Sequence, residues 1–153
     1  MRNATGIVAG VVSSTLFLAP SAAQADTLEI RLVLNCAPGL ERFSLKQGKN
    51  DHTLCVSPDI LIGDANVVSV ETVRHPDRVD GVLVTYDREA QARMAKTTRE
   101  HIMGQLGVIV NGMMVMAPVV ATPILGRGVE IAIPDDKVRN DFVARFQKGA
   151  API

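Results

Sequence analysis

The first strand is predicted by a regular alternation of apolar and polar residues. Within Thr27–Asn35, every second position is apolar, with Leu28, Ile30, Leu32 and Leu34 on one face of an extended chain. This pattern is typical of a strand that buries one side. Shorter apolar segments bounded by Gly, Pro or Asp predict further strands over residues 42–46, 53–56, 67–73, 81–86, 108–110, 113–116 and 129–133.

Helical spacing replaces this alternation after residue 86. Asp87 is a suitable N-cap for a helix that we expect to run from Arg88 to about Leu106. An earlier helical turn is predicted from Ser57 to Ile62, where Gly63 would end it. The face of the long helix expected against a sheet carries Ala90, Met94, Thr98, Ile102 and Leu106.

A second helix is predicted near the end of the chain. Asp135 or Asp136 would cap it, and Gly149 would mark its end. The apolar residues expected on its buried stripe are Val138, Phe142 and Phe146. The basic residues expected on its solvent face are Arg139, Arg145 and Lys148.

Asn111-Gly112 is the strongest local signal in the chain. The pair separates two short apolar segments, and Asn-Gly is preferred in two-residue type I′ hairpins because both residues need a positive φ. Strands mixed with two helices, without strict strand–helix alternation, predict an α+β fold with a largely antiparallel sheet and two helices packed on one face. No repeat or long linker divides residues 26–153, so we expect one domain there.

The first 25 residues are expected to be a cleavable secretory signal peptide. Arg2 gives a positive start, and the uncharged run Gly6–Leu18 is too short for an ordinary membrane-spanning helix. Ala23-Gln24-Ala25 offers the small residues that signal peptidase recognises, so we expect cleavage between Ala25 and Asp26. A buried N-terminal helix or an uncleaved anchor is the alternative. The mature chain is then expected in the periplasm, with no membrane span.

Charge and aromatic content argue against several partner classes. The 16 Lys and Arg residues balance 16 Asp and Glu residues, so the chain has no strong field for nucleic acid or anionic membranes. Aromatic residues make up 3% of the chain and Trp is absent, which leaves little for stacking single-stranded nucleic acid. We therefore expect no nucleic-acid partner.

Cys36 and Cys55 are the two cysteines of the chain. In a small exported domain two cysteines usually pair, so we expect a structural disulfide between them. A redox-active pair is the alternative, but the sequence lacks the C-x-x-C spacing that lowers a thiol pKa.

The segment Ala117–Leu125 is expected to be a partner surface. It is apolar and contains two prolines, as edge strands often do, and unpaired edges recruit extended peptides by adding a strand. A covered crossover is the alternative. Together with the preceding turn, the residues expected to bind a partner are Asn111, Gly112, Ala117, Pro118, Pro123 and Ile124.

Metal binding and hydrolysis are weaker alternatives. A soft copper site could use His101 with Met103, Met113, Met114 and Met116, although methionine more often fills core gaps. The three histidines of the chain show no metal-ligand spacing, so we expect no metal or cofactor.

A hydrolytic triad of Ser57, His75 and Asp77 has neither a nucleophile elbow nor an oxyanion-hole glycine run around the serine. We therefore expect no enzyme activity.

Several short motifs occur in the order found in one family. Thr97-Thr98 and Gly104 precede the segment 106–112 (LGVIVNG), and small-residue–proline and proline–isoleucine steps follow. With Ala117-Pro118, Pro123-Ile124 and the glycines at 126 and 128, they resemble the head subdomain of the large periplasmic domain of SecD. Upstream, Phe43–Lys46, Ser57-Pro58-Asp59-Ile60 and Asp64-Ala65 resemble the segment that opens the same subdomain. The likeness covers about residues 42–147.

The resemblance implies a role in contacting a partly folded polypeptide during export. SecD itself has membrane-spanning helices and a base below the head, neither of which the sequence shows after the signal segment, so proton-driven pulling does not carry over. The resulting hypothesis is a non-enzymatic periplasmic protein- or peptide-binding module, whose partner is a polypeptide or another periplasmic or membrane protein. A periplasmic small-molecule or copper-binding protein is the alternative.

Overall fold

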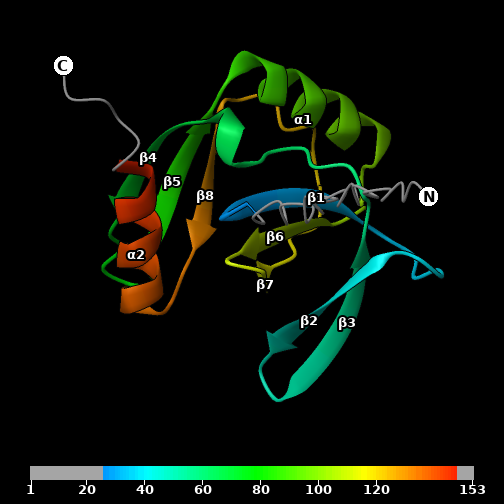
Figure 1. Cartoon of the computed structure of the whole chain (residues 1–153), viewed down its shortest axis with the longest axis horizontal. Helices are drawn as coiled ribbons and strands as arrows, with labels where there is room; N and C mark the ends of the chain where they lie inside the picture. The colour runs from blue at the N-terminus through cyan, green and yellow to red at the C-terminus, as the bar shows by residue number, and fades with distance from the viewer. Residues whose placement is uncertain (1–25, 148–153) are drawn as a thin grey trace, which may run out of the picture.

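Eight strands and two α-helices make up residues 26–147, the part of the chain that this computed structural model describes (Figure 1). The predicted signal peptide and Ala25 lie outside these residues, and Asp26 is the first residue within them. The strands are β1 Leu28–Leu34, β2 Glu41–Gln47, β3 Asn50–Val56, β4 Val67–Val73, β5 Gly81–Tyr86, β6 Leu106–Val110, β7 Met113–Met116 and β8 Gly128–Ala132. The helices are α1 Arg88–Glu100 and α2 Asp136–Gln147, with a 3-10 turn η1 at Asp64–Asn66.

The larger sheet has five strands in the order β2-β3-β1-β6-β7, and each neighbouring pair is antiparallel. β1 lies at its centre, with Leu28 opposite Val110 and Leu32 opposite Leu106. The predicted hairpin at Asn111-Gly112 joins β6 to β7. The two outer strands, β2 and β7, also contact each other, so the sheet curls back toward itself.

The smaller sheet has the order β4-β5-β8, again antiparallel throughout, and α2 lies against β4 and β5 (Figure 1). The predicted α+β class with antiparallel pairing is confirmed. The strands are divided between two sheets, which the local pattern could not reveal because alternation shows which face is buried but not which strand lies beside which.

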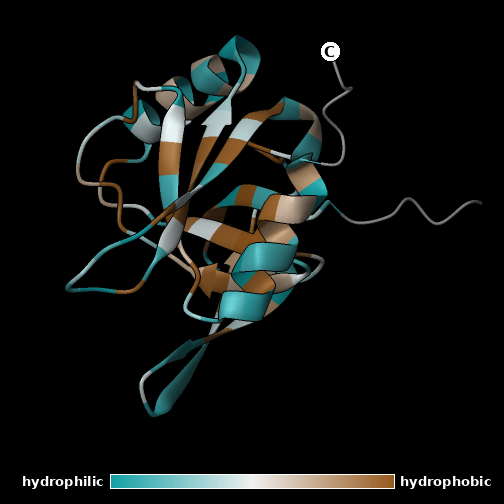
Figure 2. Cartoon of the chain, turned by 90° about the vertical axis from the view of Figure 1, so that its left-hand side faces the viewer, coloured by the Kyte–Doolittle hydropathy of each residue, from teal (hydrophilic) through white to brown (hydrophobic). Residues whose placement is uncertain are grey.

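The main core fills the space between the two sheets and the helices. Leu28 and Ile30 from β1, Val84 from β5, Met94 from α1 and Phe142 from α2 are all almost completely buried in it. Figure 2 shows hydrophilic colours on the outward side of α2 and at the tip of the β2–β3 hairpin, and hydrophobic colours along the strands behind. The alternation that predicted β1 therefore marks the face turned to this core.

A second, smaller apolar cluster lies on the opposite face of the five-stranded sheet. Leu45 of β2, Val56 of β3, Ile109 of β6 and Met114 of β7 form it. Gly107 on β6 belongs to the same region, because a Cβ at this position would come within 2.7 Å of the Met114 methyl carbon. The curl of the sheet thus brings the β2–β3 hairpin over the back of β6 and β7.

The prediction that α1 continues to Leu106 is wrong. The helix ends at Glu100, and Ile102, expected on the buried face, is 44% exposed. Met103 has a φ of 68°, and its N–H donates to the Val120 carbonyl at 2.7 Å. The helix therefore stops because the following backbone pairs with a distant segment, which helical spacing alone cannot show.

The predicted helical turn at Ser57–Ile62 is also wrong. The chain instead runs beside β1, where the Leu61 N–H donates to the Ile30 carbonyl at 2.8 Å and the Ile30 N–H donates to the Ile62 carbonyl at 2.9 Å. Pairing with a buried strand satisfies these backbone groups better than one isolated turn.

Arg139, expected in solvent, is buried with 7% of its surface exposed. Its guanidinium donates to the Ile133 carbonyl at 2.7 Å and to Asp136 Oδ1 at 2.6 Å, and it lies 3.8 Å from Asp80. These acceptors compensate for part of the loss of water around the charge, whereas the buried Nε has no partner among residues 26–147. Arg139 therefore connects α2 to the end of β8 and to the segment before β5.

Candidate functional site: a groove between two strand edges

A groove of about 710 Å³ lies where β2 meets β7. It is lined by six successive residues of β2, from Glu41 to Lys46, and by Gly112–Val115, with Pro134 beside them. Side chains of successive strand residues point to opposite faces of a sheet. A groove that contacts successive residues of a strand therefore runs along the edge of that strand, not across one face. The groove therefore follows the two outer edges of the five-stranded sheet.

These two edges run in the same direction. Because each of the four neighbouring pairs from β2 to β7 is antiparallel, the first and the fifth strand of the sheet point the same way. Neither strand has a ladder partner on its outer side among residues 26–147. An unpaired edge presents backbone N–H and C=O groups that can bind another extended chain.

On β2, every second backbone unit points into the groove. The hairpin pairs Gln47 with Asn50 across a two-residue turn at Gly48 and Lys49. Such a turn is closed by a hydrogen-bonded pair, so Gln47 and every second residue before it bond to β3. The backbone groups of Arg42, Ser44 and Lys46 then face away from β3, toward the free edge.

A buried ion pair borders this groove. Arg31 lies between Glu29 and Glu41, with 2.8 Å separating its guanidinium from each carboxylate. Glu29 and Arg31 are almost buried, whereas the Glu41 side chain is more than half exposed at the groove. Burial raises the pKa of Glu29 above its ordinary value, and the neighbouring Arg31 opposes this shift.

Neither this pair nor the edge of β2 stands out in the amino-acid sequence. Glu29 and Arg31 occupy the polar positions of the alternating strand, and such positions normally face solvent. They are buried because the β2–β3 hairpin folds over this side of β1. The sequence offers one sign of the ion pair: Glu29 and Arg31 carry opposite charges and lie two residues apart, on the same face of a strand.

The segment Ala117–Leu125, expected to be an edge, is a crossover held to the rest of the domain. Val120 donates to the Gly104 carbonyl and accepts from the Met103 N–H, both at 2.7 Å, and the Pro118 carbonyl accepts from the first residue of β6 at 3.0 Å. Pro118 itself is exposed. The backbone groups at Pro118 and Val120 are thus occupied by internal hydrogen bonds, in keeping with the crossover alternative.

Thr98 holds the end of this crossover against α1. Its hydroxyl donates to the Met94 carbonyl at 2.7 Å and accepts from the Ile124 N–H at 2.9 Å, in a fully buried position. Gln91 donates to the Leu125 carbonyl at 2.8 Å. Two of the motifs noted in the sequence, the threonine and the proline–isoleucine step, are therefore joined by a buried hydrogen bond.

The predicted turn lies at the end of the groove. Asn111 and Gly112 have φ angles of 51° and 78°, as the type I′ turn requires, and Gly112 lines the groove. The Asn111 N–H donates to the Thr27 carbonyl at 2.9 Å. Of the other residues expected to bind a partner, Pro123 is exposed, and Ile124 is half-buried against the main core.

Cys36 and Cys55 form a disulfide, with their Cα atoms 5.1 Å apart. Cys55 is fully buried at the end of β3, and Cys36 is exposed just after β1. The bond therefore joins the central strand to the hairpin that forms one wall of the groove.

Replacing both cysteines with alanine is expected to lower the free energy of unfolding by about 3 kcal/mol, because the unfolded chain loses a cross-link across 19 residues. Urea denaturation of the variant and of the oxidised and reduced wild-type domain would measure this. The reduced wild-type domain should lose a similar amount. Equal stability of all three forms would contradict the prediction.

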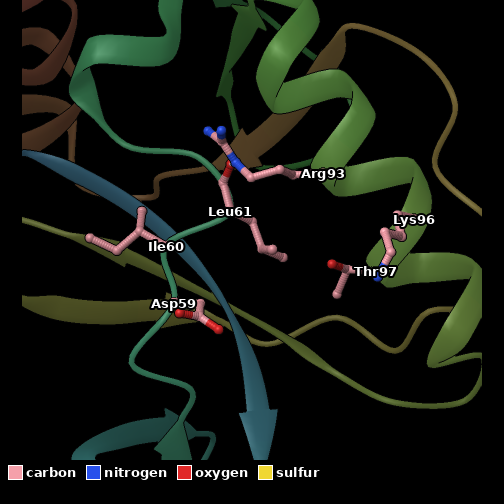
Figure 3. A pocket seen from close by; sticks show the side chains of 6 residues that line it. All are labelled: Asp59, Ile60, Leu61, Arg93, Lys96 and Thr97. Carbon is pink, nitrogen blue, oxygen red and sulfur yellow. The ribbon is translucent and has the colours of Figure 1, made fainter.

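A second pocket, of about 520 Å³, lies between α1 and the segment Asp59–Leu61 (Figure 3). Arg93 crosses it and donates to the Leu61 carbonyl at 3.2 Å, to Asn66 Oδ1 at 3.0 Å and to Glu89 at 2.7 Å. Because these three contacts use all three of its nitrogens, Arg93 acts mainly as a structural link between helix and loop. The Arg93 guanidinium is thus occupied by the protein itself at this pocket.

The residues of the hydrolase alternative have separate partners. The Ser57 hydroxyl accepts from the Asp59 N–H at 3.2 Å, whereas the His75 imidazole pairs with Glu130 on β8 and lies 3.2 Å from Arg78. Within residues 26–147, no three His, Cys, Asp or Glu side chains group closely enough to hold a metal ion.

The methionines of the copper alternative are distributed between the core and the surface. Met114 packs in the second cluster and Met116 against the main core, whereas Met103 and Met113 are exposed, as is His101. Met114 and Met116 thus serve as core residues, which the packing interpretation expected.

Comparison with known proteins identifies the family. The sequence profile described as "SecDF, P1 head subdomain" matches residues 41–150. No curated protein matches the chain at a significant level. Neither helix of the described residues has the length and apolar character needed to cross a bilayer.

Two solved structures have a similar fold. One is reported as a membrane component, SecDF, that enhances protein export; it has a TM-score of 0.61 and 18% identity, covering 85% of this chain and 66% of the other. A SecDF structure in a super-membrane-facing form has a TM-score of 0.61 and 17% identity, covering 84% of this chain and 19% of the other. This chain spans less than two thirds of either SecDF chain. Because the profile match covers most of its sequence, the chain belongs to the family of the SecDF P1 head subdomain.

Proposed function

We propose that this protein is a non-enzymatic, periplasmic polypeptide-binding module that acts in protein export. The family supports the link to export, because one similar structure is described as enhancing protein export. The disulfide between Cys36 and Cys55 is in keeping with an oxidising compartment. The predicted signal peptide over residues 1–25 would deliver the chain there.

The groove between β2 and β7 is the proposed binding site, in place of the crossover 117–125. The observation that carries this proposal is the meeting of two unpaired strand edges at an apolar groove. A bound segment in extended conformation would form backbone hydrogen bonds with the free edge of β2 and contact apolar side chains of both strands. Backbone bonding of this kind tolerates many sequences, as a module that binds unfolded chains requires.

Replacing Ser44 with proline is expected to abolish binding of an unfolded polypeptide while preserving the fold. Proline has no N–H, and its ring obstructs a strand added at this edge, but edge strands accept it where the N–H faces away from the ladder. The measurement is fluorescence anisotropy with a labelled, reduced and carboxymethylated protein, and circular dichroism checks folding.

The matched control is Ser44→Ala, which removes the hydroxyl but keeps the backbone donor. This variant should bind as the wild type does. Equal binding by the proline variant would remove the edge of β2 from the site, and failure of the wild-type domain to bind would refute the proposed function.

A further inference from the structure

We propose that the β2–β7 groove selects extended segments with the pattern acidic–apolar–any–apolar–acidic. This inference rests on the proposed function and adds the chemistry of the preferred segment. It follows from the different character of the two faces of β2 where the strand lines the groove.

The inner face of β2 is apolar. Leu45 is buried in the second cluster, and Phe43 packs against the same cluster, beside Met114 of β7. A strand added along this edge would turn every second side chain toward the same face. Those side chains have to be apolar, because a polar group at this cluster would lose water without gaining a partner.

The outer face of β2 is basic. Arg42 and Lys46 are exposed at the groove, with the small Ser44 between them. Neither cation forms a salt bridge with any carboxylate of residues 26–147. Among the lining residues that the structure describes, Glu41 is the one acidic side chain, and it is already paired with Arg31 at 2.8 Å. Asp51 lies opposite Lys46 in the β2–β3 ladder without forming a salt bridge to it, and Cys55 lies opposite Arg42. The groove therefore presents to a bound segment two cations that are not held in a salt bridge.

The spacing of the two cations sets the spacing of the acidic residues. Arg42 and Lys46 are four residues apart, about 13 Å along a strand. Side chains directly opposite each other on neighbouring strands lie about 5 Å apart, so carboxylates four positions apart can face both cations at once. Apolar residues at the second and fourth positions then lie on the side of Phe43 and Leu45. The pattern reads the same from either end and fits a segment bound in either direction.

The test compares two labelled peptides of equal length, one centred on Glu-Val-Thr-Val-Glu and the other on Lys-Val-Thr-Val-Lys, by fluorescence anisotropy. We expect the acidic peptide to bind the mature domain about tenfold more tightly at low salt, with the difference shrinking as salt screens the charges. The variant Arg42→Glu/Lys46→Glu should reverse the preference. The control Arg88→Glu/Arg99→Glu makes the same change of net charge on exposed residues of α1 and should leave the preference unchanged.

The possible outcomes separate this inference from the proposed function. If both peptides bind the wild-type domain equally, or if the preference is independent of salt, the charge selection is overturned while the groove remains a peptide site. If neither peptide nor unfolded protein binds, the proposed function fails as well. A preference that persists in Arg42→Glu/Lys46→Glu, or reverses in the α1 control, would also overturn the assignment of selectivity to β2.

Discussion

Replacing Phe142 with alanine is expected to lower the free energy of unfolding by about 3–5 kcal/mol, the usual cost of removing a buried aromatic side chain. Phe142 is 1% exposed and belongs to the main core, where α2 lies against β4 and β5. Its ring also packs against Phe146, with ring centroids 5.0 Å apart. The substitution would leave a cavity between helix and sheet that a rigid sheet cannot fill.

Phe146 provides the matched comparison, because it carries the same side chain one turn later but is only partly buried. Urea denaturation of both alanine variants should show a clearly smaller loss for Phe146→Ala. Equal losses would mean that α2 is stabilised by the aromatic pair itself rather than by burial of Phe142 in the main core.

Replacing Arg31 with methionine is expected to cost about 3–5 kcal/mol at neutral pH, because it leaves the buried Glu29 carboxylate without a partner. The Glu29 side chain is only 10% exposed and lies 2.8 Å from the guanidinium. Loss of the second contact, to Glu41, adds little, since that carboxylate is 57% exposed and can regain water.

The loss should depend on pH in a defined direction. Burial already raises the pKa of Glu29 in the folded state, and removal of Arg31 raises it further. A raised pKa means that the contribution of Glu29 to stability is retained below its ordinary value of 4.5 and is lost as the pH rises through the folded-state value. Urea denaturation at about pH 4 should therefore show a smaller loss for Arg31→Met than at about pH 7.

The double variant Glu29→Leu/Arg31→Met is the control for this interpretation. Replacing both charges with apolar groups of similar size is often neutral or stabilising, since no unpaired charge remains. We expect the double variant to recover most of the stability lost in Arg31→Met and to lose its extra pH dependence. A double variant less stable than the single one would show that packing, rather than charge, explains the loss.

The strands and the hairpin turn were predictable because their signals are local. The segments at 67–73 and 81–86 form β4 and β5 with the predicted bounds, and Asn111-Gly112 makes the predicted turn. In each case alternation or a positive φ restricts a few neighbouring residues, whatever the rest of the chain does. The family resemblance also came from local motifs in their order, and the sequence profile confirms it.

Features that depend on distant partners were predicted poorly. The end of α1 is decided by the pairing of Met103 with Val120, and the turn expected near residue 60 is replaced by contact with β1. Arg139 has the spacing of a solvent-facing residue but is drawn inward by the Ile133 carbonyl and by Asp136. The first two errors have the same cause: a tertiary hydrogen bond overrides the preference of the local segment. Arg139 differs, because its acceptors lie only three and six residues before it.

Taken alone, the sequence determined the α+β class, most of the strands, the pairing of Cys36 with Cys55 and the family. The tertiary structure decided that the strands form two sheets and that the larger one curls until β2 meets β7. That curl buries Glu29 and Arg31 and creates the groove proposed to bind extended chains. The pattern along a strand fixes which side is buried, but only long-range packing fixes which edge stays free, and in this protein the proposed function depends on the free edges.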